Sequence, residues 1–184
     1  MSRFLSKASE SLLPYTPGEQ PQGRKFIKLN TNECPYPPSP KVAEAILAGY
    51  EENSSKIMPL ELANLRLYSD PEERVLIEAI ADHYGVGTNQ VIAGNSDEIL
   101  GFAFRAFCDQ NAPLQFADLT YGFYPALCGL YGIPFKVVPL EEDFTLNIEP
   151  YKNCGNNVII ANPNAPTGMN LPLSAIEEVA ASNP

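Results

Sequence analysis

The most constraining feature of this sequence is an alternation of short apolar runs with longer amphipathic segments that begins at Val91. The alternation predicts an α/β fold in which a mostly parallel sheet is flanked by helices. Ligands of such sheets gather beyond the carboxyl ends of the strands, so we expect the loops that follow the strands to form the site. The expected strands are residues 91–93, 113–118, 135–138 and 157–161, and the expected helices are residues 96–107, 121–132 and a last one that opens with a capping box at Ser174 and Glu177.

The chain before Val91 is organised differently. Six prolines within residues 1–38 forbid long helices and disfavour central strands, which predicts an extended arm. Ser39 and Pro40 open a helix that ends near Asn53. Asp70 and Glu73 predict a capping box at the start of a second helix, which Gly85 ends. We therefore divide the chain into residues 1–55, the arm and first helix, and residues 56–184, the first part of the α/β domain.

Composition excludes several classes of function. The net charge is −10 and the 12 Lys and Arg are scattered, which argues against nucleic-acid binding. No apolar run approaches the roughly 20 residues of a membrane span, and the first residues lack the apolar core of a secretion signal. Four widely spaced cysteines and one histidine predict free thiols in a reducing cytoplasm and no metal site.

The turn between the first strand and its helix is a candidate anion site. Gly94 and Asn95 form a tight turn, and Ser96 is expected to cap the helix, with Asp97 and Glu98 in its first turn. Backbone N–H groups and the helix dipole at such a junction attract a phosphate. An ordinary capped strand–helix junction explains the same residues, and the acidic pair must then point away from any anion.

Other nucleotide and hydrolase signatures are absent from the sequence. It contains no G-x-G-x-x-G and no G-x-x-x-x-G-K-[ST], which argues against nicotinamide and nucleoside-triphosphate sites. A single histidine, with no serine flanked by glycines in a nucleophile elbow, argues against a hydrolase triad.

Five stretches in one order resemble the fold-type-I pyridoxal-phosphate aminotransferases, and within them the histidinol-phosphate aminotransferases most closely. The resemblance covers nearly the whole chain and implies an incomplete large domain of that fold, preceded by an arm. Each motif is weak alone, and the order makes them specific. The stretches are residues 29–36 (LNTNECPY), 68–70 (YSD), 93–98 (AGNSDE), 120–124 (TYGFY) and 162–168 (NPNAPTG).

The resemblance implies a role for each stretch. In the turn, Asn95 and the backbone N–H groups of Ser96 and Asp97 correspond to the cup for the cofactor phosphate. Tyr121 corresponds to the aromatic residue that stacks on the pyridine ring, although a core aromatic explains it too. Tyr68 corresponds to the tyrosine that reaches the cofactor of the neighbouring subunit, which implies a homodimer. The arm residues near the substrate are Asn32 and Glu33.

Two departures from the family pattern bear on the site. The cup has Ala93-Gly94-Asn95 where the family commonly has Gly-Asn-Gly, and Asn95 tolerates a left-handed turn. The asparagine that binds the 3-oxygen of the cofactor is Ala165 here, so either Asn164 replaces it or the bond is absent. The family's Schiff-base lysine would lie beyond Pro184, so we expect the 184 residues alone to be inactive.

The resemblance implies transamination of an amino-acid or amino-phosphate substrate, with L-histidinol phosphate as amino donor and 2-oxoglutarate as acceptor, in histidine biosynthesis. A threonine-phosphate decarboxylase, or another amino-acid aminotransferase of the same fold, is the alternative within this fold. A non-catalytic fragment that binds a phosphate or a partner chain is the alternative from another class.

Overall fold

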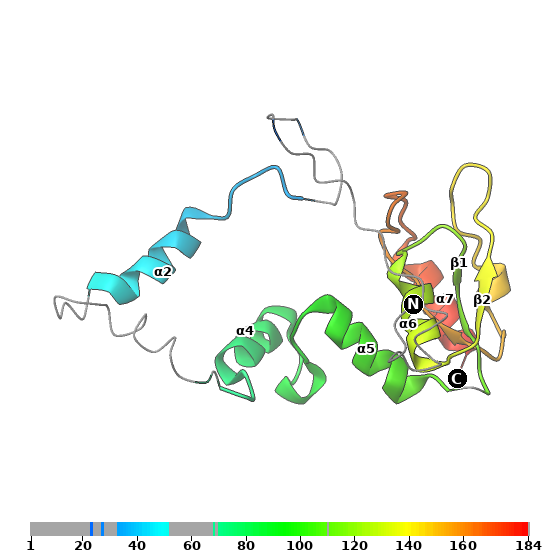
Figure 1. Cartoon of the computed structure of the whole chain (residues 1–184), viewed down its shortest axis with the longest axis horizontal. Coiled ribbons are helices and arrows are strands. Elements are labelled where there is room, and N and C mark those ends of the chain that lie inside the picture. Colours follow the sequence, from blue (N-terminus) through cyan, green and yellow to red (C-terminus); the bar gives the residue numbers. More distant parts are fainter. Residues whose placement is uncertain are drawn as a thin grey trace, which may run out of the picture. The chain divides into compact units, whose positions relative to one another are not determined.

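The computed structural model describes residues 23, 27, 33–51, 68, 70–109 and 111–183, and for residues 46–51 it describes the backbone alone. Contacts group these residues into two compact units that meet in the sequence between Ala93 and Gly94. In Figure 1 the first unit includes the cyan helix α2 and the helix α4, and the second runs from the green helix α5 to the red helix α7.

The first unit contains the helices α2 (Pro40–Glu51) and α4 (Arg74–Tyr84) and the short 3-10 helix η1 (Thr88–Gln90). The prediction of a helix at Ser39–Pro40 is confirmed, and the Ser39 hydroxyl accepts the Lys41 N–H at 3.4 Å. Gly85 ends α4 in a left-handed conformation, with φ of 66°, as predicted.

The predicted start of α4 was wrong by one turn. Asp70 does accept backbone N–H groups, from Glu72 at 3.1 Å and from Arg74 at 3.3 Å, and it also pairs with the Arg74 guanidinium. Glu73, however, has φ of 49° and precedes the helix, so it cannot close a capping box from inside the first turn. The helix begins at Arg74 because the chain forms a separate turn over residues 71–72 first.

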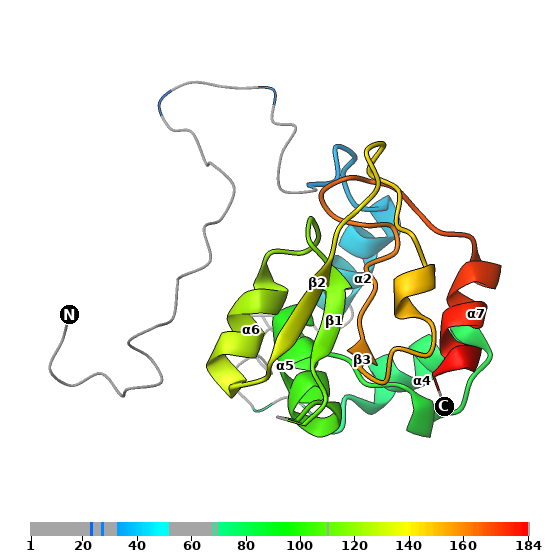
Figure 2. The ribbon, with the colours of Figure 1, turned by 90° about the vertical axis from the view of Figure 1, so that its right-hand side faces the viewer.

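The second unit is built on a parallel sheet, which confirms the predicted fold class. Its strands are β1 (Leu114–Ala117), β2 (Phe135–Val138) and β3 (Asn157–Val158), in the order β2-β1-β3. Leu114 lies opposite Phe135 on one side and Asn157 on the other, and both pairings are parallel. Figure 2 shows β1 between its two neighbours. This central strand is buried along its whole length, as expected for a strand with both faces covered.

Three of the predicted strands differ in extent from the observed ones. The strand predicted at residues 113–118 is one residue shorter at each end, Leu114–Ala117. Residues 91–93 are not a strand, because an extended segment becomes a strand only by pairing and these residues pair with no strand in the described part of the chain. The last strand stops at Val158 instead of residue 161, although the Ile159 N–H still donates to the Gln115 carbonyl at 3.1 Å.

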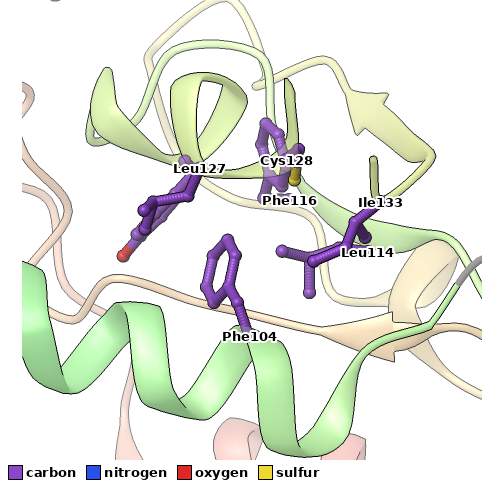
Figure 3. Packing of buried hydrophobic residues seen from close by; sticks show 7 residues of the cluster. Phe104, Leu114, Phe116, Leu127, Cys128 and Ile133 are labelled. Carbon is purple, nitrogen blue, oxygen red and sulfur yellow. The ribbon is translucent and has the colours of Figure 1, made fainter. Parts of the chain in front are cut away.

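Helices α5 (Ser96–Phe107) and α6 (Phe123–Tyr131) cover one face of the sheet. Phe104 from α5 and Leu127 from α6 meet the side chains of Leu114 and Phe116, which point to this face because strand residues alternate (Figure 3). Phe116 is 1% exposed, and its ring lies 5.7 Å from the Tyr124 ring and 5.3 Å from the Phe135 ring. This cluster holds the start of α6 against the sheet.

The opposite face is covered by the 3-10 helix η2 (Glu149–Tyr151) and by α7 (Leu173–Ser182). Val138, Tyr151 and Val179 are buried there. The capping box predicted at Ser174 was wrong: α7 begins at Leu173 after Pro172, so Ser174 lies inside the first turn and cannot cap it.

Gln115 and Tyr151 both have fully buried polar side chains in this unit, but they differ in their hydrogen bonding. The Gln115 amide donates to the Pro150 carbonyl at 2.8 Å and accepts from Asn156 at 2.9 Å. The Tyr151 hydroxyl has no hydrogen-bond partner among the described residues, and burial raises the pKa of this phenol above its usual range. One polar group is satisfied and the other is not.

This contrast predicts opposite effects of removing the two polar groups. Tyr151→Phe is expected to leave the free energy of unfolding unchanged or to raise it by about 1 kcal/mol, because no bond is lost. Gln115→Leu is expected to lower it by about 2 kcal/mol, because the Pro150 carbonyl and the Asn156 amide lose a partner. Urea unfolding of both variants measures the difference. A loss for Tyr151→Phe as large as that for Gln115→Leu would show that the hydroxyl is bonded in solution.

Candidate functional site

The turn before α5 is closed by Asn95 and not by Ser96, which corrects the predicted cap. Asn95 has extended dihedral angles, φ of −66° and ψ of 137°, and its side chain accepts the Asp97 N–H at 3.0 Å. Its carbonyl accepts the first helical bond, from Ile99 at 3.0 Å. Ser96 is already helical, so its hydroxyl is not in the position of a cap.

This geometry keeps the character of an anion site. The first N–H groups of an α-helix have no partner inside the helix, and the dipole adds partial positive charge at the same place. Asn95, Ser96 and Asp97 are all exposed. Asn95 already accepts one donor, so an anion that bound the Asp97 N–H would take the place of the Asn95 carboxamide oxygen.

Tyr121 lies at the same place as this helix terminus. Its hydroxyl donates to an Asp97 carboxylate oxygen at 2.8 Å. Its ring meets the Tyr124 ring edge-on, with centroids 5.5 Å apart and an interplanar angle of 86°, and lies 6.2 Å from the Phe123 ring. Tyr121 is half-buried, whereas Tyr124 belongs to the core. The predicted stacking residue is therefore supported by the core on one side and tied to the α5 terminus on the other.

Asn164 connects the loop of residues 162–168 to the segment that leads into Tyr121. It is 6% exposed. Its amide nitrogen donates to the Leu119 carbonyl and the Thr167 hydroxyl, both at 3.0 Å, and its carbonyl oxygen accepts from the Thr120 hydroxyl at 2.8 Å. Both amide hydrogens are used inside the protein. A bond from Asn164 to a cofactor oxygen would require one of them to be released, and Ala165 supplies no donor.

Three of the stretches singled out in the sequence thus meet at the carboxyl ends of the strands. The other predicted site residues belong to the first unit or are not described. Glu33 and Tyr68 are exposed residues of the first unit, and Asn32 is outside the described residues. Their roles stay predictions.

Two features of this site were missed in the sequence. Thr120 had no signal except its place next to Tyr121, because a hydroxyl partner 44 residues away in the chain leaves no local pattern. The sequence pointed to Asp97 through its backbone N–H, and predicted of its carboxylate only that it points away from an anion. The structure gives that carboxylate a specific partner.

The described cysteines and acidic residues form no metal site, and the buried Cys128 is not a reactive thiol. Burial, with a smaller effect of Cys108, raises the pKa of the Cys128 thiol to about 11, so at neutral pH it is a protonated core side chain. Within the described ranges, no three His, Cys, Asp or Glu side chains are grouped as metal ligands would be. None of the helices described here has the length and apolar character needed to cross a bilayer.

Comparisons with known proteins all point to one family, the aminotransferases. The family model for aminotransferases of class I and II matches residues 24–183. A histidinol-phosphate aminotransferase of Pseudomonas putida (strain W619) is 47% identical over 184 residues, which are 100% of this chain and 50% of that protein. Histidinol-phosphate aminotransferase 1 of Methylococcus capsulatus (strain Bath) is 49% identical over 185 residues, 100% of this chain and 48% of that protein.

A solved structure shows the same fold. The histidinol-phosphate aminotransferase of Sinorhizobium meliloti, solved in complex with pyridoxal-5'-phosphate, superposes with a TM-score of 0.78 at 23% identity. The alignment covers 100% of this chain and 49% of that one, so the chain spans about half the length of the relatives it matches. From the match over residues 24–183 and the identity along the whole sequence, the chain belongs to the family of class I and II aminotransferases.

Proposed function

We propose that this chain forms the phosphate- and ring-binding part of a pyridoxal-phosphate-dependent aminotransferase. The observation that carries the proposal is the hydrogen bond from the Tyr121 hydroxyl to Asp97. It places an aromatic ring beside a helix N-terminus, which is the pair of features that a phosphorylated heteroaromatic cofactor needs. Family membership gives independent support.

The described residues fit this cofactor by their chemistry. Ser96 and Asp97 offer backbone N–H donors to the phosphate, with Asn95 as the cap that an arriving phosphate displaces from the Asp97 N–H. Tyr121 offers its ring face to the pyridine ring. Pyridoxal phosphate, when bound, supplies the electron sink for proton transfer at the substrate α-carbon. The residues of this chain bind and orient it.

Further assignments complete the proposal. Tyr68 reaches the phosphate of the neighbouring subunit, so the proposed enzyme is a homodimer, which we place in the cytoplasm. Asn32 and Glu33 lie near the substrate. Asn164 either reaches the cofactor 3-oxygen by releasing one of its present bonds, or holds the loop alone. Residues 1–55 form the arm and first helix, and residues 56–184 begin the large domain.

L-Histidinol phosphate is the proposed amino donor, with 2-oxoglutarate as acceptor. The names of the relatives that share 47% and 49% identity with this chain support this choice. The rivals are another amino-acid aminotransferase and a threonine-phosphate decarboxylase, whose substrate also carries an amine and a phosphate.

The first test uses the protein expressed from its natural reading frame. It is incubated with pyridoxal phosphate, reduced with borohydride and digested, and the masses of the intact protein and of the labelled peptide are measured. One stable adduct on a lysine outside residues 1–184 is the expected result. Absence of an adduct would overturn the catalytic proposal and leave a phosphate- or partner-binding chain.

A second measurement separates the substrates. The loaded protein is mixed with L-histidinol phosphate, with other amino acids or with O-phospho-L-threonine, each with 2-oxoglutarate. Glutamate formation with L-histidinol phosphate is expected. Glutamate formed only with another amino acid, or carbon dioxide released from O-phospho-L-threonine, would replace the proposed substrate.

A further inference from the structure

The side chain of Asp97 presents a problem at an anion site, because its negative charge lies in the first turn of α5, where the phosphate is proposed to bind. The structure shows where this charge is used. The carboxylate accepts the Tyr121 hydroxyl at 2.8 Å, while the backbone N–H of the same residue is capped by Asn95. One residue therefore contributes a donor to the proposed phosphate cup and an acceptor to the aromatic ring.

We propose that the Asp97 carboxylate is a positioning residue that holds the Tyr121 ring at a fixed place relative to the N–H donors of α5. The inference rests on the proposed function and deepens it, because the spacing between the ring and the helix terminus decides which phosphorylated aromatic molecule fits. Asp97 acts through Tyr121 and not on the reacting atoms.

The contacts around Tyr121 show why such a tie is needed. The ring is half-buried and rests edge-on against Tyr124, which belongs to the core cluster with Phe104 and Phe116. This contact supports the ring on the side of the core. The hydrogen bond to Asp97 fixes the far end of the ring, so that rotation about the side-chain bonds no longer changes where the face points.

Electrostatics favours a carboxylate at this position over a neutral acceptor. A hydrogen bond to an ionised acceptor is stronger than one between neutral groups. The N-terminus of a 12-residue helix stabilises the negative charge of Asp97 even when no phosphate is bound. The neighbouring Glu98 carries the same charge in the same turn and is exposed, so it provides a matched control for the loss of charge alone.

The binding test uses the full-length protein and two probes, pyridoxal phosphate and pyridoxal without the phosphate. Asp97→Ala and Tyr121→Phe are each expected to weaken the binding of both probes about tenfold, as loss of one charge-assisted bond predicts. The double variant is expected to bind no more weakly than either single one, because both changes remove the same bond. Glu98→Gln is expected to change the binding less than twofold.

A spectroscopic readout separates positioning from general structure. The visible circular dichroism of the bound cofactor reports how its ring is held, and Asp97→Ala and Tyr121→Phe should alter it alike. Additive losses in the double variant, or an equal effect of Glu98→Gln, would overturn the proposal.

A cofactor-free measurement keeps this inference distinct from the proposed function. Tyrosine labelled at its Cζ atom gives a Tyr121 signal, assigned by its absence in Tyr121→Phe. That signal is expected to shift in Asp97→Ala and to stay in place in Glu98→Gln. No shift would overturn the inference whatever the protein binds. A shift in a protein that binds neither probe would support the Asp97–Tyr121 bond and reject the cofactor.

Discussion

Replacing Asn164 with alanine is expected to lower the free energy of unfolding by about 3 kcal/mol. The side chain is 6% exposed and makes three hydrogen bonds, to Leu119, Thr120 and Thr167. Alanine leaves the Leu119 carbonyl and two hydroxyl groups without this partner. It also removes the link between the loop of residues 162–168 and the segment before Tyr121. Urea unfolding, followed by circular dichroism, measures the loss.

Asn162 provides a control of the same residue type in the same loop. Its side chain makes two hydrogen bonds, accepting the Leu171 N–H at 2.9 Å and donating to the Leu171 carbonyl at 3.2 Å, but it is exposed. Water can replace these bonds, so Asn162→Ala is expected to cost less than about 1 kcal/mol. Equal losses for the two variants would show that burial of Asn164 is not what makes its bonds important.

The Asn164→Asp variant tests the choice between the two roles of this residue. It keeps an oxygen for Thr120 and loses both donors. If Asn164 only holds the loop, the binding of pyridoxal phosphate should weaken in proportion to the loss of stability. If it also reaches the 3-oxygen, the visible spectrum of the bound cofactor should change as well.

Replacing Phe116 with alanine is expected to cost about 4 kcal/mol, the largest effect at any single position considered for this chain. The side chain is 1% exposed on the central strand and contacts rings on both α6 and β2. Its removal leaves a cavity between α5, α6 and the sheet, and the loss of packing adds to the loss of buried apolar area. Chemical denaturation with an unchanged m-value would identify the effect as one on the folded state.

Two further substitutions serve as controls for the effect of burial and of side-chain volume. Phe102→Ala removes the same ring from α5 at a position that is 56% exposed, and it is expected to cost less than about 1 kcal/mol. Phe116→Leu keeps most of the apolar volume and is expected to cost about 1.5 kcal/mol. A loss for Phe102→Ala near that of Phe116→Ala would mean that the face of α5 carrying Phe102 is buried in the folded protein.

Local patterns in the sequence were sufficient for the type and order of most elements. Short apolar runs predicted the strands, and the helical spacing in residues 96–107 reflects which side chains a regular backbone places on one face. The parallel sheet followed from the helices between the strands, since a parallel pair needs a crossover connection. Gly85 marked the end of α4 because the left-handed conformation there suits glycine.

Contacts between distant residues were decided only by the tertiary structure. Residues 91–93 have the composition of a strand but find no strand to pair with in the described residues. Ser96 and Asn95 are equally good caps by residue type, and the dihedral angles of the turn selected Asn95.

The same distinction applies to the site. The sequence by itself predicted that residues 93–98, 120–124 and 162–168 come together, because motifs in a fixed order and the rule that loops meet at the carboxyl ends of strands need no coordinates. The partner of Asp97, 24 residues away, and those of Asn164, 44 and 45 residues away, were decided by folding. Hydrogen bonds depend on distances within a few tenths of an ångström, and only the packed sheet and helices set those distances.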